Sequence, residues 1–437
     1  MCNQISQYLE TKQLLFKHQY GFRRHHSTIH PIIQLLNQCT HANNSRPPQN
    51  TLAIFCDLSK AFDVLQHDIL LYKLSNLGIR GRALTWMKNY LTNRNQYVAI
   101  DQTNSEIETI PCGVPQGSIL GPLLYLIYVN DVQSSTSAQI LSFADDTTIT
   151  VSSNNINTLM QKANSSLSDI NTWFCANKLF LNFSKTKFII LSPPQVSVKT
   201  NHTTLQTANN IIERTNSHKF LGIHIDEHLT WKKHISHVNS KIAHSLFAIK
   251  QVQKTLPPSA LRTLYFSLIH PHLIYGIHAW GNTASSTLNK TNILMKRAIR
   301  LINNAPYNSH SEPLFKKSKI LTLPHLHEQQ IATFSHDYEH RKLPRSFNNF
   351  FQYTRNIKTR NTRSTDLYYI PTPRTSFLQR LPHFHFPQIA NKFANAITSL
   401  PSRSRLKSTI KTQFIDSYQT TIQCERQRCP DCHPLQQ

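Results

Sequence analysis

Apolar residues along the chain fall into short unbroken runs and longer stretches with helical spacing. The short runs have the length of β-strands and lie at 52–56, 96–100, 140–144, 147–151, 187–191 and 219–225. The longer stretches predict helices, at 60–77, 118–130, 156–179, 235–255, 259–275 and 288–303. Residues 340–385 are rich in Pro, Asn, Thr and Arg and are expected to be irregular.

The order of these segments predicts an α+β domain in which helices pack on one face of an antiparallel sheet. The two runs around residue 145 flank the pair Asp145-Asp146, which predicts a hairpin that turns at this pair. After Trp231 the pattern becomes mostly helical. With 437 residues, the chain is too long for one compact core and suits two or three domains.

The charge is strongly positive and unevenly placed. The net charge is +25, of which residues 1–230 carry +4 and residues 231–437 carry +21. No acidic residue occurs between Glu227 and Glu312. Such an excess attracts a polyanion, most simply nucleic acid. An acidic membrane surface is the alternative, but the longest apolar run, Ile119 to Val129, is far shorter than the roughly 20 residues of a membrane span.

Five cysteines are scattered through the first half without the spacing of a disulfide framework, so a reducing, intracellular environment is expected. Three others lie near the end with a histidine, at Cys424, Cys429, Cys432 and His433. This pattern suggests a Zn²⁺ site, although the adjacent Cys-His pair is awkward for one tetrahedral ion. Zinc therefore stays a secondary hypothesis.

Three carboxylates stand where predicted strands end. Asp57 follows the run at 52–56, and Asp145 and Asp146 lie between the strands of the hairpin. If these strands are neighbours, about 5 Å apart, Asp57 and Asp145 would share a pair of divalent ions, as two-metal phosphoryl transfer requires. Hard oxygen ligands favour Mg²⁺, with Mn²⁺ as a substitute. A capping role is the plain alternative for Asp57, but two adjacent carboxylates repel each other unless a cation is present.

Glycine is rare in the chain, with nine in 437 residues, yet three fall within residues 111–122. These are Gly113, Gly117 and Gly121. A cluster of this kind predicts a close approach of the backbone to another group.

These motifs resemble those of reverse transcriptases from non-long-terminal-repeat retrotransposons, the LINE-type elements, and the jockey-like ones most closely. The three polymerase motifs correspond to Phe55–Asp63, to Gly113–Ser118 with Leu120–Leu123, and to Phe143–Asp146. Flanking segments resemble the family in the same order, at Gln19–Arg23, Trp173–Lys187, Lys219–Ile223 and Ala298–Pro306. The resemblance covers roughly residues 15–330, and so many matches in order are far more specific than one motif.

The resemblance implies a right-hand polymerase fold and an RNA-directed DNA polymerase. It implies partial fingers at 1–50, a palm with the primer-grip region at 51–230, a helical thumb at 231–330 and a basic, partly irregular region at 331–437. The expected partners are an RNA template, a DNA primer, deoxynucleoside triphosphates and an endonuclease encoded by the same element. Action in the nucleus is expected from the family, and a membrane partner is not.

The resemblance also assigns roles to residues. Asp57 and Asp145 would bind both Mg²⁺ ions, with Asp146 in support. Phe62 would exclude the ribose 2′-hydroxyl, although its spacing equally fits the core of a helix. The other expected contacts with the nucleotide are Arg23, Gln116, Gly117 and Lys187, with Lys185 as the alternative to Lys187 for protonating pyrophosphate. Contacts with nucleic acid are expected from Lys219, Gly222, Lys290, Lys296, Arg297 and Arg300, where a solvated helix face is the alternative for the last four.

The family's earlier fingers motifs would lie before Met1, and the chain shows no segment like the family's N-terminal endonuclease, so it is expected to be a piece of a longer protein. An inactive remnant that still binds nucleic acid is therefore the alternative to an active polymerase. An RNA-dependent RNA polymerase is a third hypothesis. Phe62 and the Phe143-Ala144 pair before the two aspartates argue against it.

Overall fold

The computed structural model describes residues 1–193, 204–207, 210–357 and 367–419. Within these ranges the chain forms two compact units. The first comprises Met1–His218 with Pro344–Ser346, and the second comprises Lys219–Leu343 with Phe347–Gln437. The predicted boundary at 330 falls inside helix α13 (Leu323–Glu339). The four-part division is otherwise untested and stays a prediction.

The first unit is built around a four-stranded antiparallel sheet with the strand order β6-β7-β1-β8. Its strands are β1 (Asn50–Cys56), β6 (Gln139–Phe143), β7 (Asp146–Ser153) and β8 (Lys187–Leu191). Its helices are α1 (Cys2–Thr11), α2 (Ile29–Asn44), α3 (His67–Asn76), α4 (Arg82–Leu91), α5 (Gly121–Tyr128) and α6 (Ile156–Ala176). The strands β9 (Thr204–Thr207) and β10 (Asn210–Glu213) form a separate hairpin.

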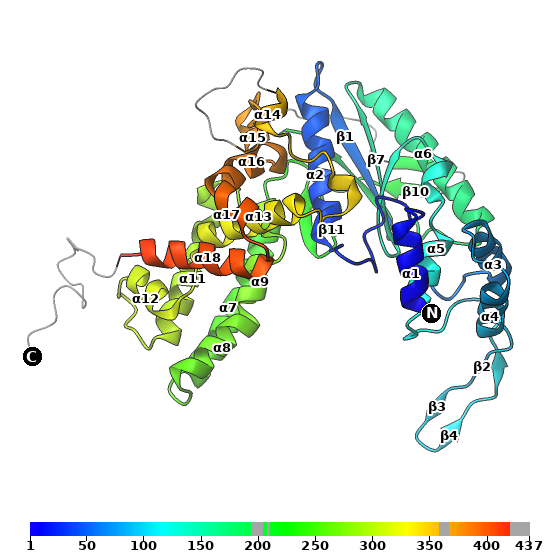
Figure 1. Ribbon diagram of the computed structural model, residues 1–437, viewed down its shortest axis with the longest axis horizontal. Coiled ribbons are helices and arrows are strands. Elements are labelled where there is room, and N and C mark those ends of the chain that lie inside the picture. Colours follow the sequence, from blue (N-terminus) through cyan, green and yellow to red (C-terminus); the bar gives the residue numbers. More distant parts are fainter. Residues whose placement is uncertain (194–203, 208–209, 358–366, 420–437) are drawn as a thin grey trace, which may run out of the picture. The chain divides into compact units, whose positions relative to one another are not determined.

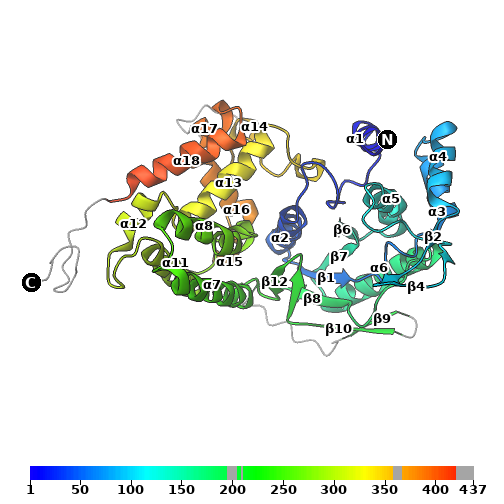
Figure 2. The same ribbon diagram turned by 90° about the horizontal axis from the view of Figure 1, so that it is seen from below.

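Helices cover both faces of this sheet, so the prediction of helices on one face was wrong. α6 packs against β7 and β1, while α2 packs against β1 and β6 from the other side (Figure 1; Figure 2). The alternation along β1 explains the arrangement, since Leu52 and Ile54 join the core under α6, while Thr51 points to the opposite face, on which α2 packs. An unbroken apolar run is typical of a strand buried on both faces, which the run at 52–56 already indicated.

Several element boundaries differ from the sequence prediction. Residues 60–63 form a turn and 64–66 are irregular, so the helix expected at 60–77 begins only at His67. The run at 96–100 is split between two short ladders, which pair β2 (Asn95–Gln96) with β5 (Glu108–Thr109) and β3 (Ala99–Ile100) with β4 (Thr103–Asn104). These strands are exposed, so no core fixes a longer strand.

The described part of the second unit is mostly helical. Its predicted strand at 219–225 is two strands, β11 (Ser217–Phe220) and β12 (Ile223–Asp226), because Leu221 and Gly222 both have positive φ and reverse the chain. The remaining elements are α7 (Lys232–Val252), α8 (Pro258–Leu268), α9 (His270–Ile274), α10 (Ile277–Trp280), α11 (Ser285–Ile302), α12 (Ser311–Ser318), α13, α14 (Thr354–Ile357), α15 (Ser376–Gln379), α16 (Pro382–Lys392), α17 (Ala394–Ser399) and α18 (Arg403–Ser417). The short η2 (Arg345–Phe347) begins in the segment that belongs to the first unit.

α7 and α11 pack side by side, and α13 lies against α16, α17 and α18 (Figure 2). The three helices predicted between 235 and 303 are confirmed as α7, α8 with α9, and α11. Pro271 divides the second of them, since proline lacks the N–H that a continuous helix would use. No helix among the described residues is long and apolar enough to cross a membrane.

Candidate active site

The three aspartates lie at one end of the sheet, where the neighbouring strands β1 and β7 meet the hairpin turn. β1 and β7 pair with Cys56 opposite Thr147, so Asp57, the next residue, comes level with Asp146. Phe143 pairs with Asp146 across the hairpin, so the turn consists of Ala144 and Asp145. The predicted hairpin is thus confirmed, but it turns one residue earlier than expected and Asp146 begins β7.

The carboxylates influence one another electrostatically. Desolvation by the surrounding protein, together with the charges on Asp145 and Asp57, raises the pKa of Asp146 to about 6. A shared site of negative charge is the environment in which a divalent cation is stabilised.

Asp57 is held by the segment that follows α6. Its backbone N–H donates to Oγ1 of Thr186 (3.3 Å), and its carbonyl accepts from the N–H of Asn182 (2.8 Å). Nζ of Lys185 lies 3.7 Å from Oδ2 of Asp57. Lys185 is 69% exposed and the aspartate 39% exposed, so this ion pair adds little stability but places a cation beside the carboxylate.

Lys187 lies elsewhere. Its Nζ is 2.8 Å from Oε2 of Glu213, and its backbone pairs with Phe55 on β1. Of the two lysines considered for pyrophosphate protonation, the structure therefore brings Lys185, not Lys187, to the aspartates.

Phe62 lies in the turn after Asp57 rather than in a helix. Its ring contacts Tyr125 on α5, with centroids 4.6 Å apart, and meets Phe22 edge-on at 6.2 Å. Burial raises the pKa of Tyr125, and the charges of Asp145 and Asp146 raise it further, which places Tyr125 near the aspartate pair. Tyr125 was missed from the sequence because it lies within an apolar helix pattern that gives no sign of a polar neighbour.

The glycine-rich segment folds back on the turn after β1. Gly113 has a φ of +86°, and a Cβ there would lie 2.6 Å from the carbonyl oxygen of Asp63. The predicted close approach therefore exists, but to this protein's own backbone. Nε2 of Gln116 donates to Oδ1 of Asp63 (2.8 Å), and Gly117 has a φ of +76° with open space where a side chain would be.

Arg23 differs from its predicted role. Its guanidinium makes two hydrogen bonds to the carboxylate of Glu10 (2.7 and 2.8 Å) and donates to the carbonyl oxygens of Phe16 and Gln19. The side chain is only 4% exposed. In this structure four of the five N–H donors of Arg23 are bonded within the protein, so the side chain has a structural role here.

The expected primer-grip residues lie on the β11–β12 hairpin. Lys219 is exposed, and Gly222 has a φ of +84°. A Cβ at Gly222 would lie 3.1 Å from the ring of Tyr275, whose hydroxyl donates to the carbonyl oxygen of Leu221 (2.6 Å). Gly222 therefore serves the packing of this hairpin against Tyr275.

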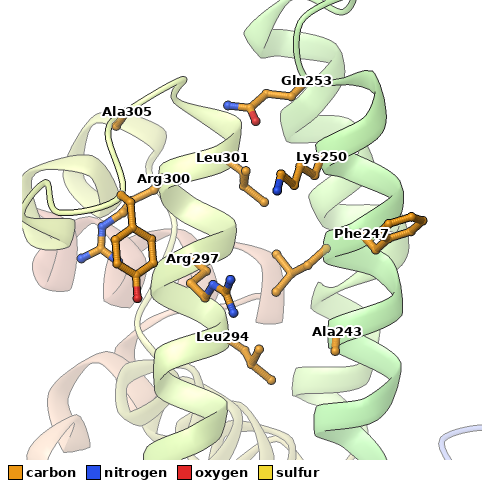
Figure 3. A pocket seen from close by; sticks show the side chains of 11 residues that line it. Ala243, Phe247, Lys250, Gln253, Leu294, Arg297, Arg300, Leu301 and Ala305 are labelled. Carbon is orange, nitrogen blue, oxygen red and sulfur yellow. The ribbon is translucent and has the colours of Figure 1, made fainter.

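The four basic residues expected to contact nucleic acid lie on α11. Lys290, Lys296 and Arg297 are exposed, whereas Arg300 is half-buried and its Nε donates to the carbonyl oxygen of Ser309 (2.7 Å). Arg297 and Arg300 line a pocket of about 460 Å³ between α7 and α11, together with Lys250 of α7 (Figure 3). The cysteines and histidine at 424–433 lie outside the described residues.

Among the residues that the structure describes, no three His, Cys, Asp or Glu side chains converge tightly enough to hold a metal ion alone. The chemistry of the aspartates nevertheless fits a divalent ion, because they offer only hard oxygen donors. Their charges also repel one another and raise the pKa of Asp146, and a bound cation would relieve this repulsion. In polymerase sites of this kind, phosphate oxygens and water complete the metal's coordination shell.

Comparisons with known proteins give a consistent result. The family described as "Reverse transcriptase (RNA-dependent DNA polymerase)" matches residues 1–225. A probable RNA-directed DNA polymerase from transposon BS of Drosophila melanogaster is 27% identical over 78% of this chain and 38% of that protein. The RNA-directed DNA polymerase from the mobile element jockey of the same species is 29% identical over 70% and 34%. The chain thus spans little more than a third of the length of these relatives.

Among solved structures, a telomerase from Candida albicans in complex with a fragment of telomeric RNA has a TM-score of 0.40 at 9% identity, covering 74% of this chain and 58% of that chain. Apo telomerase from Candida tropicalis has a TM-score of 0.41 at 12% identity, covering 69% and 50%. These likenesses are distant, and the fold assignment rests on the family match and the sheet topology. That match extends over more than half of the chain, and it includes all three aspartates. The chain belongs to the reverse transcriptase family, whose members use divalent metal ions and share the right-hand polymerase fold.

Proposed function

We propose that this chain is the polymerase part of a retrotransposon protein and extends a DNA primer on an RNA template. The reaction joins the primer 3′-oxygen to the α-phosphorus of a deoxynucleoside triphosphate and releases pyrophosphate. The observation that carries the proposal is the meeting of Asp57, Asp145 and Asp146 at one end of two neighbouring strands, where their charges act on one another.

Asp57 and Asp145 would bind two Mg²⁺ ions, with Asp146 beside them and Mn²⁺ as a substitute. Such ions make the 3′-hydroxyl more acidic and neutralise the charge on the triphosphate. Lys185, next to Asp57, is then the group placed to give a proton to the departing pyrophosphate. Phe62, whose ring packs against Tyr125, would fill the space beneath the sugar of the incoming nucleotide and so exclude a 2′-hydroxyl.

The exposed cations Lys290, Lys296 and Arg297 would contact phosphates of the template–primer. The proposal extends to a nuclear site of action and an endonuclease from the same element, both inferred from the family resemblance. Zinc binding by the C-terminal cysteines stays a separate hypothesis.

The test is primer extension by the purified chain on an RNA template with Mg²⁺ and deoxynucleotides. Asp145→Asn should abolish extension, because it removes a ligand charge while keeping the shape of the side chain. Asp169→Asn is the matched control, since Asp169 is exposed on α6. Equal extension by wild type and Asp145→Asn would overturn the assignment. A wild-type chain that binds template–primer without extending it would favour a nucleic-acid-binding remnant.

A further inference from the structure

The residues before Arg23 cover the outer edge of the catalytic hairpin. The N–H of Tyr20 donates to the carbonyl oxygen of Ser142 (2.8 Å), and the N–H of Ser142 donates to that of His18 (3.0 Å). Gln19 and Ser142 form a parallel β-bridge, so residues 18–20 extend the sheet beyond its edge strand β6. These residues are buried, and Gln19 is only 4% exposed.

The side chain of Gln19 is fixed to the turn of the hairpin. Its Oε1 accepts from the backbone N–H of Ala144 (3.1 Å) and from that of Gly21 (2.9 Å). Its Nε2 donates to the carbonyl oxygen of Ala144 (3.3 Å). One amide group therefore bonds both the N–H and the carbonyl of Ala144, the residue directly before Asp145.

The backbone of this turn needs such support. Ala144 has a φ of +56°, a left-handed conformation that residues with a side chain rarely adopt. The space beside it is also restricted, because a Cβ at Gly21 would lie 2.3 Å from the backbone nitrogen of Ala144. Only glycine at position 21 allows the two segments to approach so closely.

We propose that Gln19 is a positioning residue that fixes the Ala144 turn and thereby holds Asp145 and Asp146 in place beside Asp57. This inference rests on the proposed function, because it gives the three aspartates a metal-binding task. Gln19 does not touch substrate or metal. It acts through the backbone of Ala144, so its loss should change how well the aspartates bind a cation, beyond any general loss of stability.

Gln34 supplies a matched control. It is a buried glutamine of the same unit, 5% exposed, and its Nε2 donates to the backbone carbonyl of Ser346 (2.9 Å). Gln19→Met and Gln34→Met both replace a buried amide by an apolar side chain of similar length. The two variants therefore share the loss of buried hydrogen bonds, but only the first one releases the hairpin turn.

The test measures Mn²⁺ binding to the full-length chain by electron paramagnetic resonance, with folding checked by circular dichroism. Gln19→Met should raise the Mn²⁺ dissociation constant at least tenfold, while Gln34→Met should stay within twofold of wild type. Hydrogen exchange should accelerate in residues 139–148 in the first variant only. If Gln19→Met does not fold, Gln19→Asn serves instead, since its amide is one methylene too short to reach both groups of Ala144.

Asp145→Asn separates this inference from the proposed function. If Asp145→Asn weakens Mn²⁺ binding and Gln19→Met leaves it unchanged, the positioning role is wrong and the metal site stands. If Asp145→Asn itself binds Mn²⁺ as tightly as wild type, both the metal site and the inference fall. Equal weakening by Gln19→Met and Gln34→Met would also overturn the inference, because a general loss of stability would then explain the effect.

Discussion

Nζ of Lys185 lies 3.7 Å from Oδ2 of Asp57, whereas Lys187, two residues later, is paired with Glu213. Along a strand, residues two apart point to the same face, so spacing alone does not separate these lysines. They are separated because Lys185 precedes β8, in the turn that holds the Asp57 backbone, while Lys187 is the first residue of β8.

Lys185→Met should therefore lower the rate of nucleotide addition by about 10- to 100-fold, in the range expected when a general acid is lost. Lys187→Met should lower the rate by less than about threefold, since the substitution only removes a surface ion pair with Glu213. Single-turnover extension with each variant measures both effects. The assignment is wrong if Lys187→Met is the more damaging change.

Phe62→Val should admit ribonucleotides. A smaller side chain opens space beneath the sugar, and a change of this size in a pocket alters discrimination by roughly 10- to 200-fold. Phe62→Tyr keeps the ring that packs on Tyr125 and should preserve the preference for deoxynucleotides. The ratio of kcat/KM for a deoxynucleotide to that for the matching ribonucleotide is the measurement. Unchanged discrimination in an active Phe62→Val enzyme would reject the steric role.

The sequence predicted the hairpin around Asp145 and the strand that ends before Asp57, because each of these depends on residues close together in the sequence. It did not predict the buried role of Arg23, which depends on Glu10, thirteen residues earlier, or the place of Tyr125 beside the aspartate pair. Helices on both faces of the sheet were also missed, since a fully apolar strand such as 52–56 does not show which elements cover its two sides.

Replacing Lys290, Lys296 or Arg297 by Ala should weaken binding to template–primer and lower the salt dependence of binding by about one unit each, because each loss removes one phosphate contact. Arg300→Ala should reduce the salt dependence less, since its Nε already donates to Ser309 within the protein. Lys162→Ala is the control, since Lys162 is exposed on α6. Fluorescence anisotropy at several salt concentrations gives the slopes. Slopes unchanged in all three variants would remove α11 from the interface.

The chain should lose stability in mild acid. Burial lowers the pKa of six histidines from 6.5 to about 4, namely His18, His26, His234, His270, His278 and His385. The unfolded chain takes up these protons near pH 6.5 and the folded chain only near pH 4. Stability is therefore full above pH 6.5 and falls as the pH drops through this window.

At about 1.4 kcal/mol per pKa unit, each of these histidines lowers the free energy of unfolding by up to about 3 kcal/mol between pH 6.5 and pH 4. Denaturant unfolding at pH 7.5 and pH 5 measures the loss. His278→Gln should be less stable at pH 7.5, since it disturbs the contact with the backbone oxygen of Gln330, but it should lose less stability on acidification than wild type. An equal loss in both would show that His278 does not titrate as proposed.

The proposed divalent-metal site for nucleotide addition is formed by aspartates at the adjacent ends of β1 and β7. Rapid-quench measurement of a single deoxynucleotide addition to a DNA primer on an RNA template, by the full chain at saturating Mg²⁺, tests it most directly. We predict that Asp57→Asn slows this addition at least 1,000-fold, on the order of 4 kcal/mol in the barrier, while Asp169→Asn stays within twofold of wild type. Addition by Asp57→Asn at the wild-type rate would show that Asp57 does not bind a catalytic metal ion.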